Sequence, residues 1–196
     1  MRYASIICAA LTLSAAATAH AGPTFSATLS GANERPTPVA TPATGSAVAE
    51  LLGGPGTYVL DYSVSFSGLT SPATPIAGSP GHIHRSVNPP GNPPTDQVGP
   101  IVFPLADIAA GVTSAMVDGE WRYDDATNPL TDALVASLMA GELYVNIHSV
   151  DHPAGEVRGQ LVANAAAVPL PAALPLGVAG MALAGVVARR YRATVR

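Results

Sequence analysis

A strict alternation of apolar and polar residues between positions 58 and 66 limits what this chain can fold into more than any other feature. The segment reads YVLDYSVSF, with an aromatic or aliphatic side chain at every even position. Successive side chains of a β-strand point to opposite faces, so a period of two predicts a strand with one buried face. An amphipathic helix would instead repeat every 3.6 residues. The segment therefore favours β-structure.

Six further segments have strand-like composition and are separated by proline and glycine clusters typical of turns. They are residues 25–29, 46–51, 101–105, 112–117, 143–149 and 156–162. One segment looks helical, because Thr131 can cap it and Gly141 can end it. The sequence therefore predicts an all-β fold, an antiparallel Greek-key-like sandwich or barrel with one short helix.

The first 21 residues have the three parts of a secretory signal peptide. Arg2 supplies a positive charge, residues 6–17 form a short apolar run, and AHA at 19–21 matches a processing site. The run is too short for a stable membrane anchor. We therefore expect residues 1–21 to be a signal peptide and the protein to be exported.

The C-terminal residues carry a second targeting segment. From Val168 the chain opens with VPLP, continues as an apolar stretch long enough to cross a bilayer, and ends in Arg189, Arg190 and Arg192. This order resembles the PEP-CTERM class of exosortase sorting signals, in its VPLPA variant. The resemblance implies that residues 168–192 form a sorting signal with a transmembrane helix and that an exosortase-type protease is a partner. It also implies the envelope or extracellular matrix of a Gram-negative bacterium, with an exopolysaccharide component as a candidate partner. A plain tail anchor is the alternative.

Residues 22–163 remain as one domain, and its charge excludes several functions. The sequence has no lysine, and this domain holds only four arginines against all 13 acidic residues. It therefore lacks the basic patches that nucleic acids and anionic membranes require. The single cysteine, Cys8, lies in the expected signal peptide, which excludes thiolate metal sites and disulfides in the domain. No phosphate-binding or dinucleotide-binding motif is present, so we expect no organic cofactor.

The four histidines of this domain fall in two short segments. GHIH at 81–84 places His82 and His84 on one face of a strand, with the isoleucine between them on the other. In LYVNIHSVDH at 143–152, His148 takes the polar face of a strand and His152 follows in a turn. Because the isoleucine belongs in the core, we expect the histidines to face the outside of the domain.

Imidazole is the commonest metal ligand, and three or four imidazoles without thiolates suit Cu(II) or Zn(II). The alternative is that each histidine is a solvated residue bonded to a neighbour. Because metal ligands must be deprotonated, binding is expected to weaken as the pH falls through about 6.5.

Two proline-rich segments interrupt the strands, at residues 33–44 and 85–99. Connections of this length without regular structure are uncommon in compact domains and are often functional. We expect the first to be an ordered surface loop or extended edge. The second directly follows GHIH, which favours a role at the histidines.

Four stretches of residues 24–162 resemble the CHRD domain, a chordin-type module of secreted proteins. They are FSATLSGANERP at 25–36, GHIHRS at 81–86, GPIVFPL at 99–105 and GELYVNIHSVDHPAGEVRGQL at 141–161. The last is the most distinctive. The resemblance implies a secreted module and leaves its biochemical role open.

The GHIH stretch is also similar to the paired copper histidines of copper/zinc superoxide dismutases, whose fold is a Greek-key barrel. That likeness implies that His82, His84 and His148 are copper ligands, with His152 as a fourth ligand or a supporting group. The cysteines and the zinc ligands of that family are missing here, so any parallel is to a copper-only form.

Arg158 is a candidate catalytic residue if the domain is an enzyme. The strand pattern predicts that it points outward on the side of His148, where it can attract a small anion such as superoxide. The alternative is an ordinary pair with Glu156 or Asp151, or a bond to the backbone of the turn. Glu156 itself is expected to brace the turn before the last strand.

Two classes of function stay open from the sequence alone. The first is a non-catalytic envelope module, either with a surface copper site or as a metal-free structural or adhesive matrix module. The second is a copper-dependent superoxide dismutase.

Overall fold

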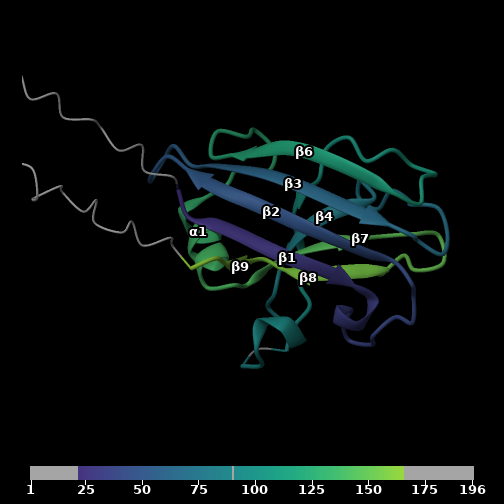
Figure 1. Cartoon of the computed structure of the whole chain (residues 1–196). Helices are drawn as coiled ribbons and strands as arrows, with labels where there is room; N and C mark the ends of the chain where they lie inside the picture. The colour runs from purple at the N-terminus through teal and green to yellow at the C-terminus, as the bar shows by residue number, and fades with distance from the viewer. Residues whose placement is uncertain (1–21, 90, 166–196) are drawn as a thin grey trace, which may run out of the picture. The chain divides into compact units, whose positions relative to one another are not determined.

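The computed structural model describes residues 22–89 and 91–165, in which antiparallel strands form one nearly closed sheet (Figure 1). The strand order is β5-β4-β7-β8-β1-β2-β3-β6, and β9 pairs with β1. The strands are β1 (Thr24–Ser30), β2 (Thr44–Leu52), β3 (Val59–Ser67), β4 (Gly81–Arg85), β5 (Ile101–Pro104), β6 (Ala115–Arg122), β7 (Leu143–Ile147), β8 (Val157–Gln160) and β9 (Val162–Ala163). The predicted all-β antiparallel fold with one short helix is confirmed.

The expected signal peptide, residues 1–21, and the expected sorting segment, residues 168–192, lie outside the described residues. Within the part of the chain that the structure describes, no helix is long and apolar enough to cross a membrane.

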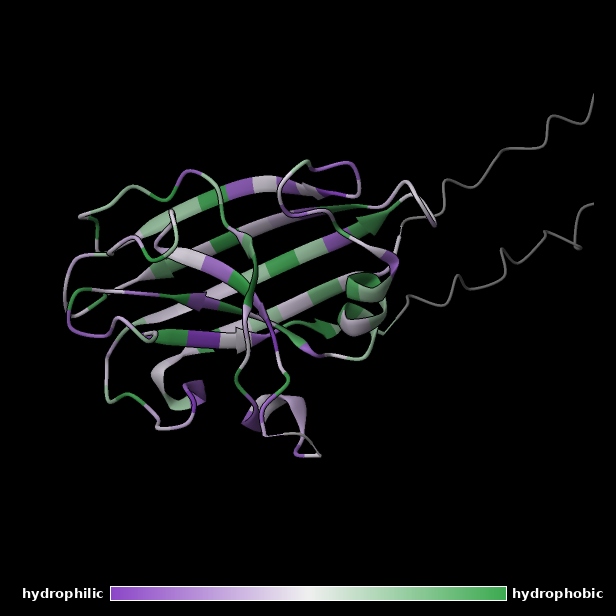
Figure 2. Cartoon of the chain, turned by 180° about the vertical axis from the view of Figure 1, so that it is seen from behind, coloured by the Kyte–Doolittle hydropathy of each residue, from purple (hydrophilic) through white to green (hydrophobic). Residues whose placement is uncertain are grey.

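Alternation along the strands creates the core. On β3, Leu60, Tyr62, Val64 and Phe66 are buried, and Asp61 between them is exposed. The same alternation of hydropathy runs along the neighbouring strands (Figure 2). The inward faces together form one hydrophobic cluster, which the period of two had predicted.

The short helix α1 (Asp132–Met139) begins and ends where the sequence predicts. The Oγ1 atom of Thr131 accepts a hydrogen bond from the backbone N–H of Leu134 at 3.3 Å, as a capping residue does. Gly141, just beyond the helix, has φ of +70°, a conformation that glycine adopts without strain.

Among the strand boundaries that differ from the prediction, two change where notable residues lie. The segment expected at 112–117 is shifted, because β6 continues to Arg122 and pairs with β3 along its whole length. Its charged residues occupy exposed positions, while Trp121 is fully buried. The segment expected at 143–149 ends at Ile147, so His148 lies just after the strand.

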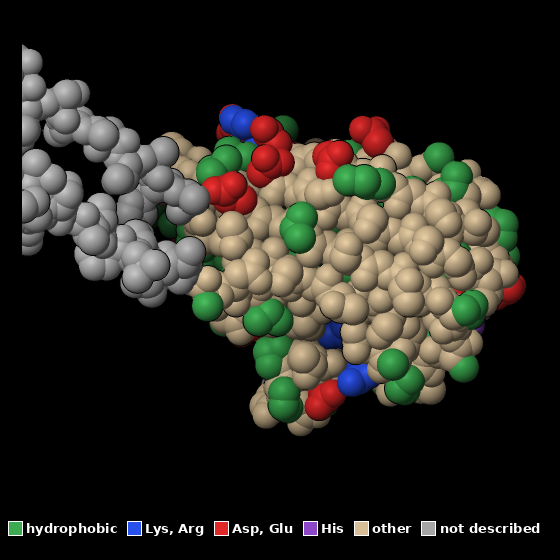
Figure 3. All heavy atoms as spheres, viewed as in Figure 1, with side chains coloured by type: hydrophobic (Ala, Val, Ile, Leu, Met, Phe, Trp, Pro, Cys, Tyr) green, Lys and Arg blue, Asp and Glu red, His purple; other side chains and the backbone are tan. Residues whose placement is uncertain are grey.

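Acidic side chains gather on the outer surface over β3 and β6 (Figure 3). Glu50 on β2 is the direct partner of Asp61 on β3, which is in turn the partner of Glu120 on β6. All three point outward. Like charges at directly opposed positions of a sheet repel each other. Arg122, 3.0 Å from Glu120, compensates one end of this acidic row.

Replacing the central carboxylate should stabilise the domain. For Asp61→Asn we expect the free energy of unfolding to rise by about 0.5 kcal/mol at low salt, since the charge repelled from both sides is removed. Urea unfolding at low and at high ionic strength measures it. The gain should shrink at high salt because exposed charges are screened; a salt-independent gain would point to a cause other than charge.

Candidate metal centre

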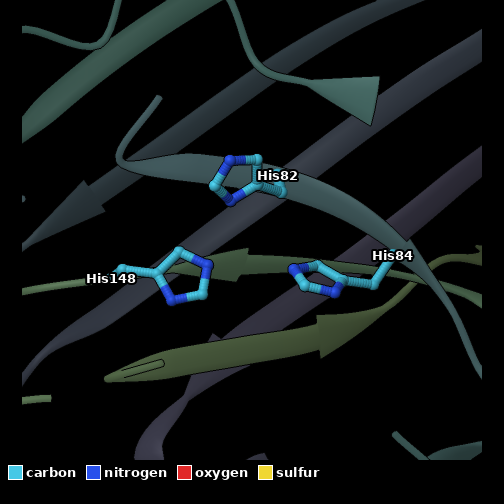
Figure 4. A group of neighbouring side chains, drawn as sticks. All are labelled: His82, His84 and His148. Atoms are coloured by element: carbon cyan, nitrogen blue, oxygen red, sulfur yellow. The ribbon is translucent and has the colours of Figure 1, made fainter. Parts of the chain in front are cut away.

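Three histidines converge beside the pair of strands β4 and β7 (Figure 4). His82 and His84 lie on β4, and the backbone N–H of His148 donates to the carbonyl of Pro80 at the start of that strand. The ring centroids are 5.0 Å apart for His82 and His148, 5.7 Å for His82 and His84, and 5.9 Å for His84 and His148. One ligand atom from each ring lies within 4.8 Å of the others. Ligand nitrogens sit about 2 Å from a bound ion, so small ring rotations would bring all three onto one ion.

These rings do not face the outside, as the strand pattern had predicted. His82 is 0% exposed, His148 3% and His84 8%. The outward face of this part of the sheet is covered by the two proline-rich segments. Within the second segment Ser86 donates to the carbonyl of Pro94, and Glu34 of the first lies against Asn146 of β7. The expectation of an exposed site is therefore wrong, because loops distant in sequence cover that face.

Backbone carbonyls orient two of the three rings. Nδ1 of His84 is 3.0 Å from the carbonyl oxygen of Gly99, and Nδ1 of His148 is 3.1 Å from that of Pro153. A carbonyl only accepts hydrogen bonds, so each Nδ1 carries the proton and each Nε2 keeps its lone pair. Neither Nε2, nor either nitrogen of His82, has a hydrogen-bond partner among the described residues. Metal-binding histidines are typically held in this way.

Burial keeps these imidazoles neutral. It lowers the pKa of His84 to about 4, with smaller contributions from the neighbouring His82 and Arg158. It lowers the pKa of His148 to about 3, assisted by His82 and His84. Burial also lowers the pKa of His82, which the nearby backbone of Ile76 partly offsets. The reference value of 6.5 therefore does not apply to these imidazoles, and we expect protons to compete with a metal at lower pH than that.

His152 is not brought into this group. It is partly exposed in the turn after β7 and lines a surface cavity with Glu34, Pro153 and Ala154.

Arg158 does not point to solvent either. It is 2% exposed, and its guanidinium lies 3.6 Å from the centre of the Tyr144 ring, a cation–π contact. It also donates to the carbonyl of Pro94 and to the side chain of Gln160. Arg158 does lie on the histidine face, as the partner of Asn146, but its predicted exposure is wrong because the loop containing Pro94 covers it. The alternative pair with Glu156 or Asp151 is not formed.

Glu156 braces the turn, as predicted. Its buried carboxylate accepts hydrogen bonds from Thr41, from the backbone and side chain of Thr70, and from Ser149. Burial raises the pKa of Glu156, but these bonds outweigh it and leave the pKa below its ordinary value. The turn that supplies the Pro153 carbonyl is thereby fixed to two distant loops.

Five supporting groups were missed by the sequence reasoning. Tyr144 stacks on His84 with centroids 4.9 Å apart, and its hydroxyl accepts a hydrogen bond from the N–H of Gly99. Asn146 is the direct strand partner of His82. The alternation of β7 placed both side chains on the histidine face and was the available signal. The carbonyls of Gly99 and Pro153 and the carboxyl of Glu34 left no signal in the sequence.

The fold and the site together define an antiparallel β-domain with a buried three-histidine cluster. The CHRD domain family model matches residues 25–161, and the chain belongs to that family. A search of curated proteins and a search of solved structures each gave no match.

The metal-free protein should lose stability on acidification because of these histidines. Unfolded histidines titrate near 6.5, whereas His84 titrates near 4 and His148 near 3 in the fold. The unfolded state therefore binds more protons below pH 6.5, and the free energy of unfolding falls by up to about 1.4 kcal/mol per pH unit for each histidine.

Urea unfolding between pH 7 and pH 5 with a chelator present measures this slope. The double variant His84→Gln/His148→Gln should have a shallower slope than the wild type. Equal slopes would show that these rings are not held neutral.

Proposed function

We propose that this CHRD-domain protein is an exported module that binds one copper ion through His82, His84 and His148. The observation that carries the proposal is the set of buried imidazole nitrogens that face one another without hydrogen-bond partners. Such atoms are costly to bury unless a ligand satisfies them. The backbone bonds at Nδ1 of His84 and His148 already fix the rings in the tautomer that a metal requires.

The donor set favours copper. The group contains three neutral imidazoles and no carboxylate or thiolate. Imidazole suits both copper and zinc, and a given nitrogen site generally binds Cu(II) more tightly than Zn(II). A metal-free structural or adhesive role would leave the unpartnered nitrogens without a compensating contact.

Burial supports a binding module over a superoxide dismutase. An enzyme must admit its substrate to the metal, and the three rings are nearly inaccessible. Arg158, the candidate for attracting an anion, is committed to Tyr144, Pro94 and Gln160. Dismutase activity of the copper-loaded protein is the second function to be measured.

Three alanine variants test the ligand set. His82→Ala and His148→Ala should each abolish stoichiometric copper binding, because each leaves only two of the three imidazole ligands in the buried site. His152→Ala should retain one copper per chain, since His152 lies outside the cluster. Metal content after dialysis and titration calorimetry with Cu(II) and Zn(II) provide the readout.

Near-ultraviolet circular dichroism should show that each variant keeps its fold. A wild-type protein that takes up no more copper than His82→Ala would overturn the metal site. Copper-dependent superoxide dismutation that disappears in His82→Ala would favour the enzyme.

We further propose that residues 1–21 direct export and that residues 168–192 are a sorting signal handled by an exosortase-type protease at a Gram-negative cell envelope. The proposal is supported by the order of VPLP, apolar stretch and arginines. The family match lies between the two segments, which agrees with their role as targeting ends.

A fusion of residues 168–196 to an exported reporter tests the sorting signal. We expect the reporter to be retained at the envelope or released only after the tail is cut. Immunoblotting of medium and membranes against both reporter and tail distinguishes the outcomes. Reporter free in the medium with an intact tail would contradict the sorting role.

A further inference from the structure

Unpartnered polar atoms are concentrated on one side of the domain. Of seven such buried side-chain atoms in the described residues, six belong to Glu34, Asn146 and the three histidines. They are Oε1 of Glu34, Oδ1 of Asn146, both ring nitrogens of His82, and Nε2 of His84 and His148. The seventh, Nε of Arg85, is 3.6 Å from the carboxylate of Glu142. A folded domain rarely collects such costly atoms in one place unless something polar occupies it.

The residues that carry these six atoms are neighbours across the sheet. The amide nitrogen of Asn146 makes a long hydrogen bond of 3.5 Å to the Glu34 carboxyl. Asn146 on β7 is the direct partner of His82 on β4, and the rings of His82 and His148 are 5.0 Å apart. Glu34, Asn146 and His82 thus form a polar row that ends at the three-histidine cluster.

Glu34, at the other end of the polar row, is one of the residues that line a surface cavity of about 250 Å³. Glu34 lines this cavity together with Asp151, His152, Pro153 and Ala154. The cavity shares its wall with the metal centre, because the carbonyl of Pro153 accepts from His148 and that of Ala154 accepts from Asn146. A cation in the cavity would meet carboxylate and imidazole groups before it met the buried cluster.

Glu34 is held in an unusual state for a carboxyl group. It is 3% exposed, and burial raises its pKa to about 8, although Arg158 and Asn146 oppose the shift. Arg35 opposes the rise of this pKa only weakly. Its guanidinium pairs with Asp96 and donates to backbone carbonyls. A cation arriving in the cavity would favour the ionised form of Glu34, and the carboxylate would then bind that cation.

We infer that this polar row is the route by which the metal ion reaches the three histidines. Glu34 takes the ion from the cavity, and Oδ1 of Asn146 passes it to His82. The inference rests on the proposed metal site and adds the entrance to it. It explains how a site with fully buried ligands fills without general unfolding of the domain.

Two variants block the route at different points. Glu34→Gln removes the carboxylate charge and keeps its shape and its contact with Asn146. Ala154→Trp covers the mouth of the cavity from an exposed position. Each has a matched control: Asp61→Asn removes an exposed carboxylate on β3, and Val150→Trp adds the same bulk to the same turn at a position 58% exposed and outside the cavity.

The purified metal-free proteins are mixed with Cu(II) alone in a stopped-flow instrument, and quenching of intrinsic fluorescence is followed. Glu34→Gln should take up copper roughly tenfold more slowly than its control, the low end of the effect of a charged cleft on association rates. Ala154→Trp should also be slower than its control, because its side chain covers the mouth of the cavity. All four variants should reach one copper per chain at equilibrium.

An uptake rate in either blocking variant equal to that of its control overturns the route. A final content below one copper in Glu34→Gln also overturns it, since Glu34 would then be a ligand of the resident ion. If the wild type binds no copper at equilibrium, the metal site itself fails, and the route fails with it. Equilibrium content and rate therefore separate the two proposals.

Discussion

Imidazole nitrogens without hydrogen-bond partners are the constraint around which this side of the domain is built. Removing such atoms from water costs free energy that packing alone does not return. The structure groups them at His82, His84 and His148 and turns them toward one another. The remaining polar atoms of His84 and His148 are bonded to backbone carbonyls. The cost is therefore confined to one small volume, which one ion can satisfy.

Holding that volume requires three chain segments that are distant in sequence. The loop after β4 supplies the Gly99 carbonyl, the turn after β7 supplies the Pro153 carbonyl, and the segment after β1 supplies Glu34. The buried carboxylate of Glu156 joins the turn to Thr41 and Thr70. The strands place the rings on one face, and these irregular segments decide that the face is buried.

The strands were predictable because their information is local. The alternation around Asp61 set both the strand and its buried face, and GHIH placed His82 and His84 side by side. The burial of the histidines was not predictable, because it depends on which loops fold over the sheet. Glu34 lies in a proline-rich segment whose composition predicts a surface loop, and the segment has no periodicity that would have indicated its burial. The same long-range packing moved the histidine pKa values away from the reference value that the sequence offered.

The two backbone contacts at the histidines have a consequence for a domain that contains no cysteine. An ion held by the rings would connect β4 to the chain after β7 and, through Gly99 and Pro153, to two surface segments. It would act as a reversible cross-link of the kind that disulfides supply in many secreted domains. The stabilisation follows mass action, adding about 1.4 kcal/mol for each tenfold rise in free ion above the dissociation constant. The resistance of the domain to proteolysis would then report the local supply of metal.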